Sequence, residues 1–85
     1  MRIIYKKHFE KEFKKLEAKI KLAFLKRLEM FEQNKFHPLL RNHPVDGVFP
    51  NCRSISITGD LRAIFQEEGD SIIFIHIGTH SELYG

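Results

Sequence analysis

The feature that most constrains the fold is an uninterrupted apolar repeat in the first third of the sequence. Its apolar members recur every three or four positions with no intervening glycine or proline, at Phe9, Phe13, Leu16, Ile20, Phe24, Leu28 and Phe31. This spacing predicts an amphipathic helix. A single helix over residues 8–33 would be about 39 Å long, whereas a compact domain of this size is roughly 30 Å across. We therefore predict a break near Glu17–Lys19, which divides the segment into a helical hairpin.

The second half of the sequence has the alternation of β-strands. A short strand is expected at Arg2–Tyr5, and three alternating segments follow later, at residues 52–58, 61–66 and 71–77. Gly-Asp pairs at 59–60 and 69–70 predict tight turns between these segments. In the middle segment, Ile64 is expected on the face opposite Ala63 and Phe65. The sequence thus predicts an α+β fold with the N-terminal strand and helical hairpin packed on a C-terminal antiparallel meander.

Length and composition limit the kind of site this fold can hold. With 85 residues, of which 42% are hydrophobic, we expect a single domain over residues 1–85 and a site in a surface groove. Cys52 is the only cysteine, which excludes an internal disulfide and suits a reducing compartment. We see no signal peptide and no membrane-spanning segment, so a cytoplasmic protein without membrane contacts is expected.

Charge is distributed unevenly along the chain. Residues 1–41 contain 12 Lys/Arg and 5 Asp/Glu, whereas residues 42–85 contain 2 and 6. The basic half predicts contact with a polyanion or an acidic protein, and the alternative is a solvated lysine-rich helix surface. If the partner is RNA, we expect Lys14, Lys15 and Lys21 to contribute to its binding.

The C-terminal sequence "IGTHSELYG" predicts a structured end. Thr79 and Glu82 have the spacing of a capping box, which indicates one helical turn from Ser81 to Tyr84. His80 and Tyr84 would then lie four residues apart on nearly the same face. We expect both side chains at the exit of the last strand, beside the 43–47 loop.

Three residues at predicted turns or strand ends are candidates for proton transfer: His43, Asp60 and His80. Histidine can both accept and donate a proton near neutral pH, so two histidines with a carboxylate suit RNA cleavage. Arg62 or Arg53 would supply a cation for the phosphate. The alternative is that Asp60 only forms a turn and Arg62 is a solvated strand residue.

The C-terminal region contains one candidate for base stacking and one pair of histidines with metal-ligand spacing. Tyr84 is a candidate for stacking on a base. His76 and His80 have the spacing of zinc ligands on a helix, but Gly78 and the surrounding β-rich residues disfavour a helix there. We therefore predict no metal and no cofactor.

Together, "HPVDG", "CRSISITGDLRAIF" and "IGTHSELYG" resemble the YafQ-like branch of the RelE/ParE toxin superfamily. The resemblance covers essentially the whole chain. It implies a toxin of a type II toxin–antitoxin system that cleaves mRNA on the ribosome as an endoribonuclease, without a metal. It also implies a toxin that is monomeric alone and forms a hetero-oligomer with a cognate antitoxin.

The resemblance also implies roles for individual residues. His43, Asp60 and His80 match catalytic positions of the family, Tyr84 matches its terminal aromatic, and Arg62 matches an arginine that contacts phosphate in the superfamily. Ser56 is a departure, because the YafQ-like pattern often has a histidine there. Two alternatives follow: a ParE-like toxin acting on DNA gyrase, and a homologue of reduced activity that only binds an antitoxin.

Overall fold

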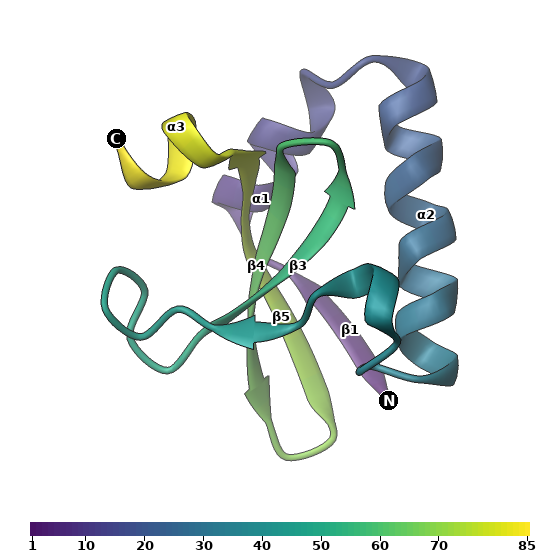
Figure 1. Ribbon diagram of the computed structural model, residues 1–85, viewed down its shortest axis with the longest axis vertical. Coiled ribbons are helices and arrows are strands. Elements are labelled where there is room, and N and C mark those ends of the chain that lie inside the picture. Colours follow the sequence, from purple (N-terminus) through teal and green to yellow (C-terminus); the bar gives the residue numbers. More distant parts are fainter.

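A computed structural model describes residues 1–85, which form a five-stranded sheet with helices around it (Figure 1). The elements in chain order are β1 (Arg2–Tyr5), α1 (Lys7–Lys14), α2 (Ala18–Gln33), the 3-10 turn η1 (Pro38–Leu40), β2 (His43–Pro44), β3 (Arg53–Thr58), β4 (Leu61–Glu68), β5 (Ser71–Thr79) and α3 (His80–Tyr84). This mixed architecture confirms the predicted α+β class.

The predicted division of the long helical segment is confirmed. α1 ends at Lys14 and α2 begins at Ala18, because Glu17 adopts an extended backbone with ψ of 153°. The molecule measures 30 × 27 × 25 Å, so an undivided helix over residues 8–33 would have projected beyond it. None of the helices is long and apolar enough to cross a membrane.

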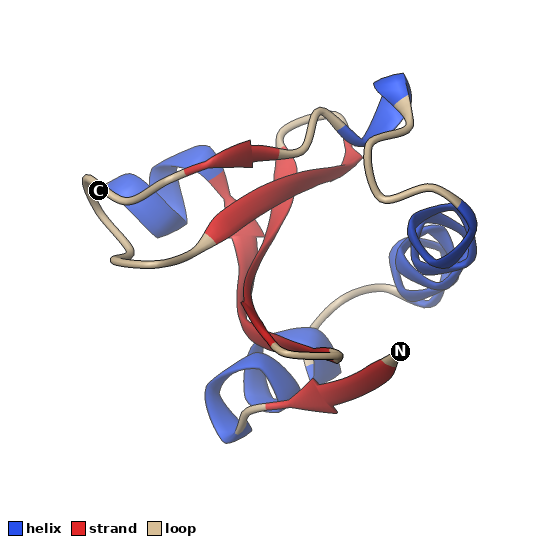
Figure 2. Cartoon of the chain, turned by 90° about the horizontal axis from the view of Figure 1, so that it is seen from below, coloured by secondary structure: helices blue, strands red, loops and turns tan.

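The two helices are connected as predicted, but each packs on its own part of the sheet. α1 lies against β5, and α2 lies against β3. Seen from below, α2 stands at one side of the curved sheet and α1 beneath it (Figure 2). Aromatic side chains bridge the helices, since the Phe24 ring lies 5.4 Å from the rings of both Phe9 and Phe13.

The predicted meander is confirmed, and it forms the centre of a larger sheet. The strand order is β1-β5-β4-β3-β2. β3, β4 and β5 pair antiparallel, and the turns between them use Gly59 and Gly69 at φ of 47° and 60°. β1 pairs parallel with β5 at one edge, and the two-residue β2 pairs with β3 at the other.

The core lies between the sheet and the helices and is rich in phenylalanine. The largest fully buried rings are Phe24, Phe31, Phe65 and Phe74. Phe31 meets Phe65 edge to face at 5.2 Å, and Phe65 contacts Phe74 at 5.8 Å. Burying such rings makes a large apolar contribution to stability. Phe24 and Phe31 belong to the helical repeat, and Phe65 and Phe74 come from β4 and β5.

The opposite face of the sheet is also covered, which sequence alternation did not predict. Ile64 has no exposed surface although it lies opposite Ala63 and Phe65. Its cross-strand neighbours are Ser54 and His76, and the Phe49 ring packs 5.4 Å from that of His76. Phe49, in the segment between β2 and β3, therefore covers part of this face, and the pairing of β4 with β5 shifts register after Ile64.

Candidate functional site

A surface cleft of about 490 Å³ opens between the 41–48 segment, β4 and α3. Four of the five residues predicted for catalysis line it: His43, Arg62, His80 and Tyr84. Its remaining lining residues are Arg41, Pro44, Val45, Gly47 and Val48. The cleft thus combines two arginines and two histidines and contains no carboxylate.

The ring of His43 has a defined orientation. β2 holds this residue opposite Ser54 at the edge of the sheet, and its Nδ1 lies 2.7 Å from the carbonyl oxygen of Arg41. Because a carbonyl oxygen can only accept a hydrogen bond, Nδ1 carries the proton. In the neutral ring the lone pair is then on Nε2, which can accept a proton from a substrate.

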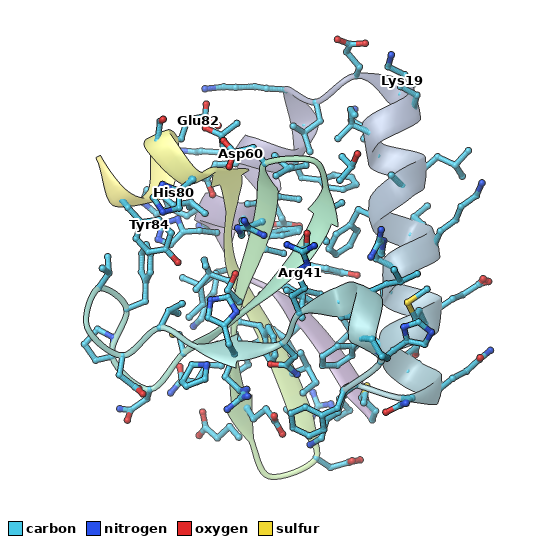
Figure 3. All side chains as sticks on the ribbon, viewed as in Figure 1. Lys19, Arg41, Asp60, His80, Glu82 and Tyr84 are labelled. Atoms are coloured by element: carbon cyan, nitrogen blue, oxygen red, sulfur yellow. The ribbon has the colours of Figure 1, made fainter.

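His80 and Tyr84 form a pair on α3, as predicted, with ring centroids 4.7 Å apart. They project from the same side of this short helix (Figure 3). The predicted capping box is present: Thr79 Oγ1 accepts from the Glu82 amide at 3.2 Å, and the Glu82 carboxylate accepts from the Thr79 amide at 2.8 Å. The cap fixes the start of α3 and with it the placement of His80.

Arg62 enters the cleft from β4. It is half-buried and lies opposite Ser56 on β3 and Gly78 on β5. Its guanidinium makes no hydrogen bond and no ion pair within the chain. Its guanidinium is therefore free to bind an anion. Ser56 lies beside Arg62 on this face of the sheet. This is the position at which the YafQ-like sequence pattern often has a histidine.

Asp60 does not line the cleft. It lies in the exposed turn between β3 and β4, above Arg41 in the view of Figure 3. The turn forms because Gly59 adopts a positive φ. The structure therefore groups both candidate histidines without the carboxylate that was predicted to accompany them.

The other predicted RNA-contacting residues also lie outside the cleft. Arg53 Nε donates to Asn42 Oδ1 at 2.7 Å, and its guanidinium lies 5.5 Å from the Phe36 ring. Of the two arginines considered for the phosphate, Arg62 is the one that reaches the cleft. The three lysines fall elsewhere: Lys14 and Lys21 line a groove beside α1 and α2, and Lys15 lines a small pocket beside Gly78.

Sequence reasoning missed Arg41, which lines the cleft. The residue ends η1 and lies two positions before His43, within "LLRNHP". A cation so close to a candidate catalytic histidine is a signal that could have indicated it. Its side chain points up across the sheet in Figure 3.

A polar contact between β5 and α1 lies outside the cleft and involves His76 and Glu12. His76 is partly buried, and its Nδ1 lies 3.3 Å from Glu12 Oε1 on α1. The same oxygen accepts from the Ile77 amide at 3.1 Å. Phe49 contacts both His76 and Tyr84, at 5.4 and 5.9 Å, so α1 is connected to α3 through packed side chains.

Two groups outside the cleft, Tyr5 and Cys52, have raised pKa values. Burial, with a smaller contribution from the negative charge of Glu32, raises the pKa of Tyr5. Burial, with a smaller contribution from Asp46, raises the pKa of the Cys52 thiol. Both groups are therefore neutral at physiological pH, and the buried Cys52 has the character of a structural thiol and not of a nucleophile.

Comparison with known proteins agrees with this architecture. YafQ from E. coli strain BL21(DE3) superimposes with a TM-score of 0.77 at 22% identity, covering 100% of both chains. The E. coli DinJ-YafQ complex gives 0.75 at 23% identity, again with both chains fully covered. A YoeB/ParE toxin from Agrobacterium tumefaciens gives 0.76 at 15% identity, covering 94% of this chain and 99% of that one. At these identities the structures establish the fold.

The family is established by sequence. No curated protein matches this chain significantly. The family model of YafQ, described as a bacterial toxin of type II toxin–antitoxin systems, matches residues 1–85. The chain therefore belongs to the YafQ family of bacterial toxins from type II toxin–antitoxin systems.

Proposed function

We propose that this toxin is a ribosome-dependent endoribonuclease that cleaves mRNA by acid–base catalysis in the cleft of His43 and His80. The observation that carries the proposal is the convergence of two histidines and two unpaired arginines in one cleft without a carboxylate. Such a site attracts a phosphodiester and provides the groups for both proton transfers. Because this reaction takes place on translating ribosomes, we also propose a cytoplasmic location.

The proposed reaction divides the proton transfers between the two histidines. His43 Nε2 removes the proton from the 2′-hydroxyl, and the resulting oxygen attacks the adjacent phosphorus. Protonated His80 donates its proton to the departing 5′-oxygen, so the P–O5′ bond breaks as the P–O2′ bond forms. Arg62 stabilises the charge that accumulates on the phosphorane. The products are a 2′,3′-cyclic phosphate and a free 5′-hydroxyl.

Tyr84 and Asp60 have supporting roles in this proposal. In this proposal the Tyr84 ring stacks on a base next to the scissile bond. The ring also packs against His80. Asp60 precedes Leu61, which pairs with Thr79 at the start of α3, and it does not line the cleft. We therefore assign proton transfer to the two histidines and leave Asp60 as an auxiliary candidate.

The first prediction tests the histidines. Replacing His80 with alanine should lower the rate of mRNA cleavage by about 10²–10⁴-fold, because a general acid is lost. His43→Gln should have a comparable effect through loss of the base. Cleavage is measured on programmed ribosomes and on naked RNA, with the new ends mapped for a cyclic phosphate.

The control is His37→Ala. His37 lies outside the cleft, where its ring accepts from the Leu39 amide at 3.1 Å, so this variant should cleave normally. Full cleavage by a folded His80→Ala variant would contradict the assignment. If the wild-type protein leaves mRNA intact but inhibits gyrase in a supercoiling assay, the ParE-like alternative is correct. Inactivity in both assays, with antitoxin binding retained, would favour the homologue of reduced activity.

We also propose that the partner is an acidic antitoxin that fills a second groove. This groove, of about 420 Å³, has apolar lining residues Tyr5, Phe9, Phe13, Phe24 and Leu25, and its charged lining residues are Lys14, Lys21 and Glu10, so the lysines outnumber the one carboxylate. An apolar segment that carries Asp or Glu would match both the apolar lining and the lysines. The E. coli neighbour is a toxin bound to its antitoxin DinJ, which supports a partner of this kind.

A further inference from the structure

We propose that Arg41 is a catalytic residue of the cleft, in which its guanidinium binds the RNA phosphate with Arg62 while its backbone carbonyl orients His43. This inference extends the proposed nuclease function, since it adds a second phosphate-binding side chain and explains how the base is held. Three observations carry it: the backbone conformation of Arg41, the bond from its carbonyl, and the lack of any partner for its side chain.

The backbone conformation of Arg41 is unusual for an arginine. Its φ and ψ are 49° and 44°, in the left-handed region that favours glycine. The only other residue with a side chain in this region is Asn51, a residue type that tolerates it. Glycine would adopt this turn without steric cost, so the side chain retained at position 41 is a candidate for function.

The same conformation directs the carbonyl of Arg41 to His43. After η1 the Arg41 amide donates to the Pro38 carbonyl at 3.3 Å, and the chain then reverses so that the Arg41 carbonyl accepts from His43 Nδ1. A right-handed residue would continue the turn and direct this carbonyl elsewhere. The left-handed turn therefore sets the tautomer that His43 needs to act as a base.

The guanidinium of Arg41 has no partner within the protein. Two other arginines of the chain have partners, since Arg27 donates to the Leu39 carbonyl and Arg53 donates to Asn42. The three ion pairs of the molecule involve neither Arg41 nor Arg62. With no Asp or Glu lining the cleft, both charges remain uncompensated. Two planar donor groups beside a base favour a phosphodiester over a single small anion.

Arg41→Gly isolates the guanidinium, because glycine keeps the left-handed turn and the carbonyl to His43. We expect cleavage to slow by about 10²–10³-fold, the usual effect of removing one preorganised donor to the transition state. Arg41→Lys should recover part of the rate, because it restores the charge without the planar fork. Two matched controls are Asn51→Gly, which places glycine at the other left-handed residue, and Arg2→Gln, which removes a cation on β1. Both should cleave at the wild-type rate.

A second measurement is independent of cleavage. The probe is a short single-stranded RNA with a 2′-deoxynucleotide at the scissile position, which binds but cannot react. The logarithm of the association constant falls linearly with the logarithm of salt concentration. For Arg41→Gly the slope of this line should be shallower by about 0.7, as expected for one lost phosphate contact. The ¹⁵N spectrum of neutral His43 should show a proton on Nδ1 in both the wild type and Arg41→Gly.

The outcomes separate this inference from the nuclease proposal. If the wild type cleaves RNA and Arg41→Gly matches it in rate and salt slope, the guanidinium of Arg41 has no role and the nuclease stands. If the wild type does not cleave, but the salt slope depends on Arg41, the arginine binds phosphate and the nuclease proposal fails. A proton on Nε2 of neutral His43 would overturn the orienting role of the carbonyl.

Discussion

At the scale of single residues, one cross-strand row contains both a site residue and an unsatisfied polar group. His43, Ser54, Ile64 and His76 are paired in sequence across β2, β3, β4 and β5, so their side chains share one face. His43 reaches the cleft, whereas Ser54 is fully buried and its hydroxyl has no hydrogen-bond partner. A buried polar group without a partner costs stability, because it has lost its bonds to water.

The prediction at this scale is that Ser54→Ala stabilises the toxin. Removing an unpaired buried hydroxyl should raise the free energy of unfolding by about 1 kcal/mol, within the range for such a group. Urea unfolding followed by circular dichroism measures this change. Ser56→Ala is the control, since Ser56 is only partly buried and its stability should change little. A marked loss of stability in Ser54→Ala would show that the hydroxyl has a partner in solution.

At the scale of elements, α3 depends on its cap more than on burial. The helix runs only from His80 to Tyr84 and has no buried residue. Gly78 leaves room for the cap, because a Cβ at this position would lie 3.2 Å from Glu82 Oε1 and 3.3 Å from Glu82 Cβ. The two reciprocal bonds of Thr79 and Glu82 therefore hold the helix in place.

The prediction for α3 is that loosening the cap lowers activity with little effect on the fold. Thr79→Ala removes one capping bond, which costs about 0.5–2 kcal/mol of local helix stability, so His80 and Tyr84 should be displaced for part of the time. RNA cleavage should fall while the melting temperature changes little, and Gly78→Ala should act in the same direction. Ser81→Ala, on the same turn without a capping bond, is the control.

A double variant tests whether the cap acts through the histidine. In the background of His80→Ala, the Thr79→Ala change should cause a smaller loss of cleavage than in the wild type, because the part of its effect that acts through His80 is already gone and only the displacement of Tyr84 remains. A full additional loss would mean that the cap supports some other part of the site.

At the scale of the whole molecule, the cleft and the lysine-lined groove share no residue. RNA chemistry and antitoxin binding are therefore proposed for separate surfaces. Lys14 and Lys21 line the antitoxin groove, whereas Lys15 lines a different pocket with Glu12, Ile77 and Glu82. All three lysines belong to the basic first half of the chain, for which we propose an attraction to a polyanion.

Charge reversal should distinguish the two partners. Lys15→Glu should weaken ribosome association and leave antitoxin binding nearly unchanged, while the pair Lys14→Glu and Lys21→Glu should weaken both. Ribosome affinity of the wild type should fall steeply with salt, because phosphate contacts release counterions. Co-sedimentation with ribosomes and calorimetry with the antitoxin measure these effects. Ribosome binding that is independent of salt would contradict an electrostatic interface.

The sequence by itself determined the features that depend on neighbours along the chain. The division of the helical segment, the meander with its glycine turns and the capping box before His80 are all confirmed. Each is encoded by periodicity or by hydrogen bonds across a few residues, so a local pattern is sufficient to specify it.

The tertiary structure decided what depends on neighbours in space. Only the strand order shows that β1 lies parallel to β5 and that β2 holds His43 beside Ser54. The left-handed turn at Arg41 brings that residue into the cleft, while the β3–β4 turn leaves Asp60 outside it. These outcomes depend on the pairing register of the strands, on where the chain reverses direction, and on which side chains compete for the same hydrogen-bond partners. No short stretch of sequence contains all the groups that compete, so the composition of the site is decided only when the sheet is assembled.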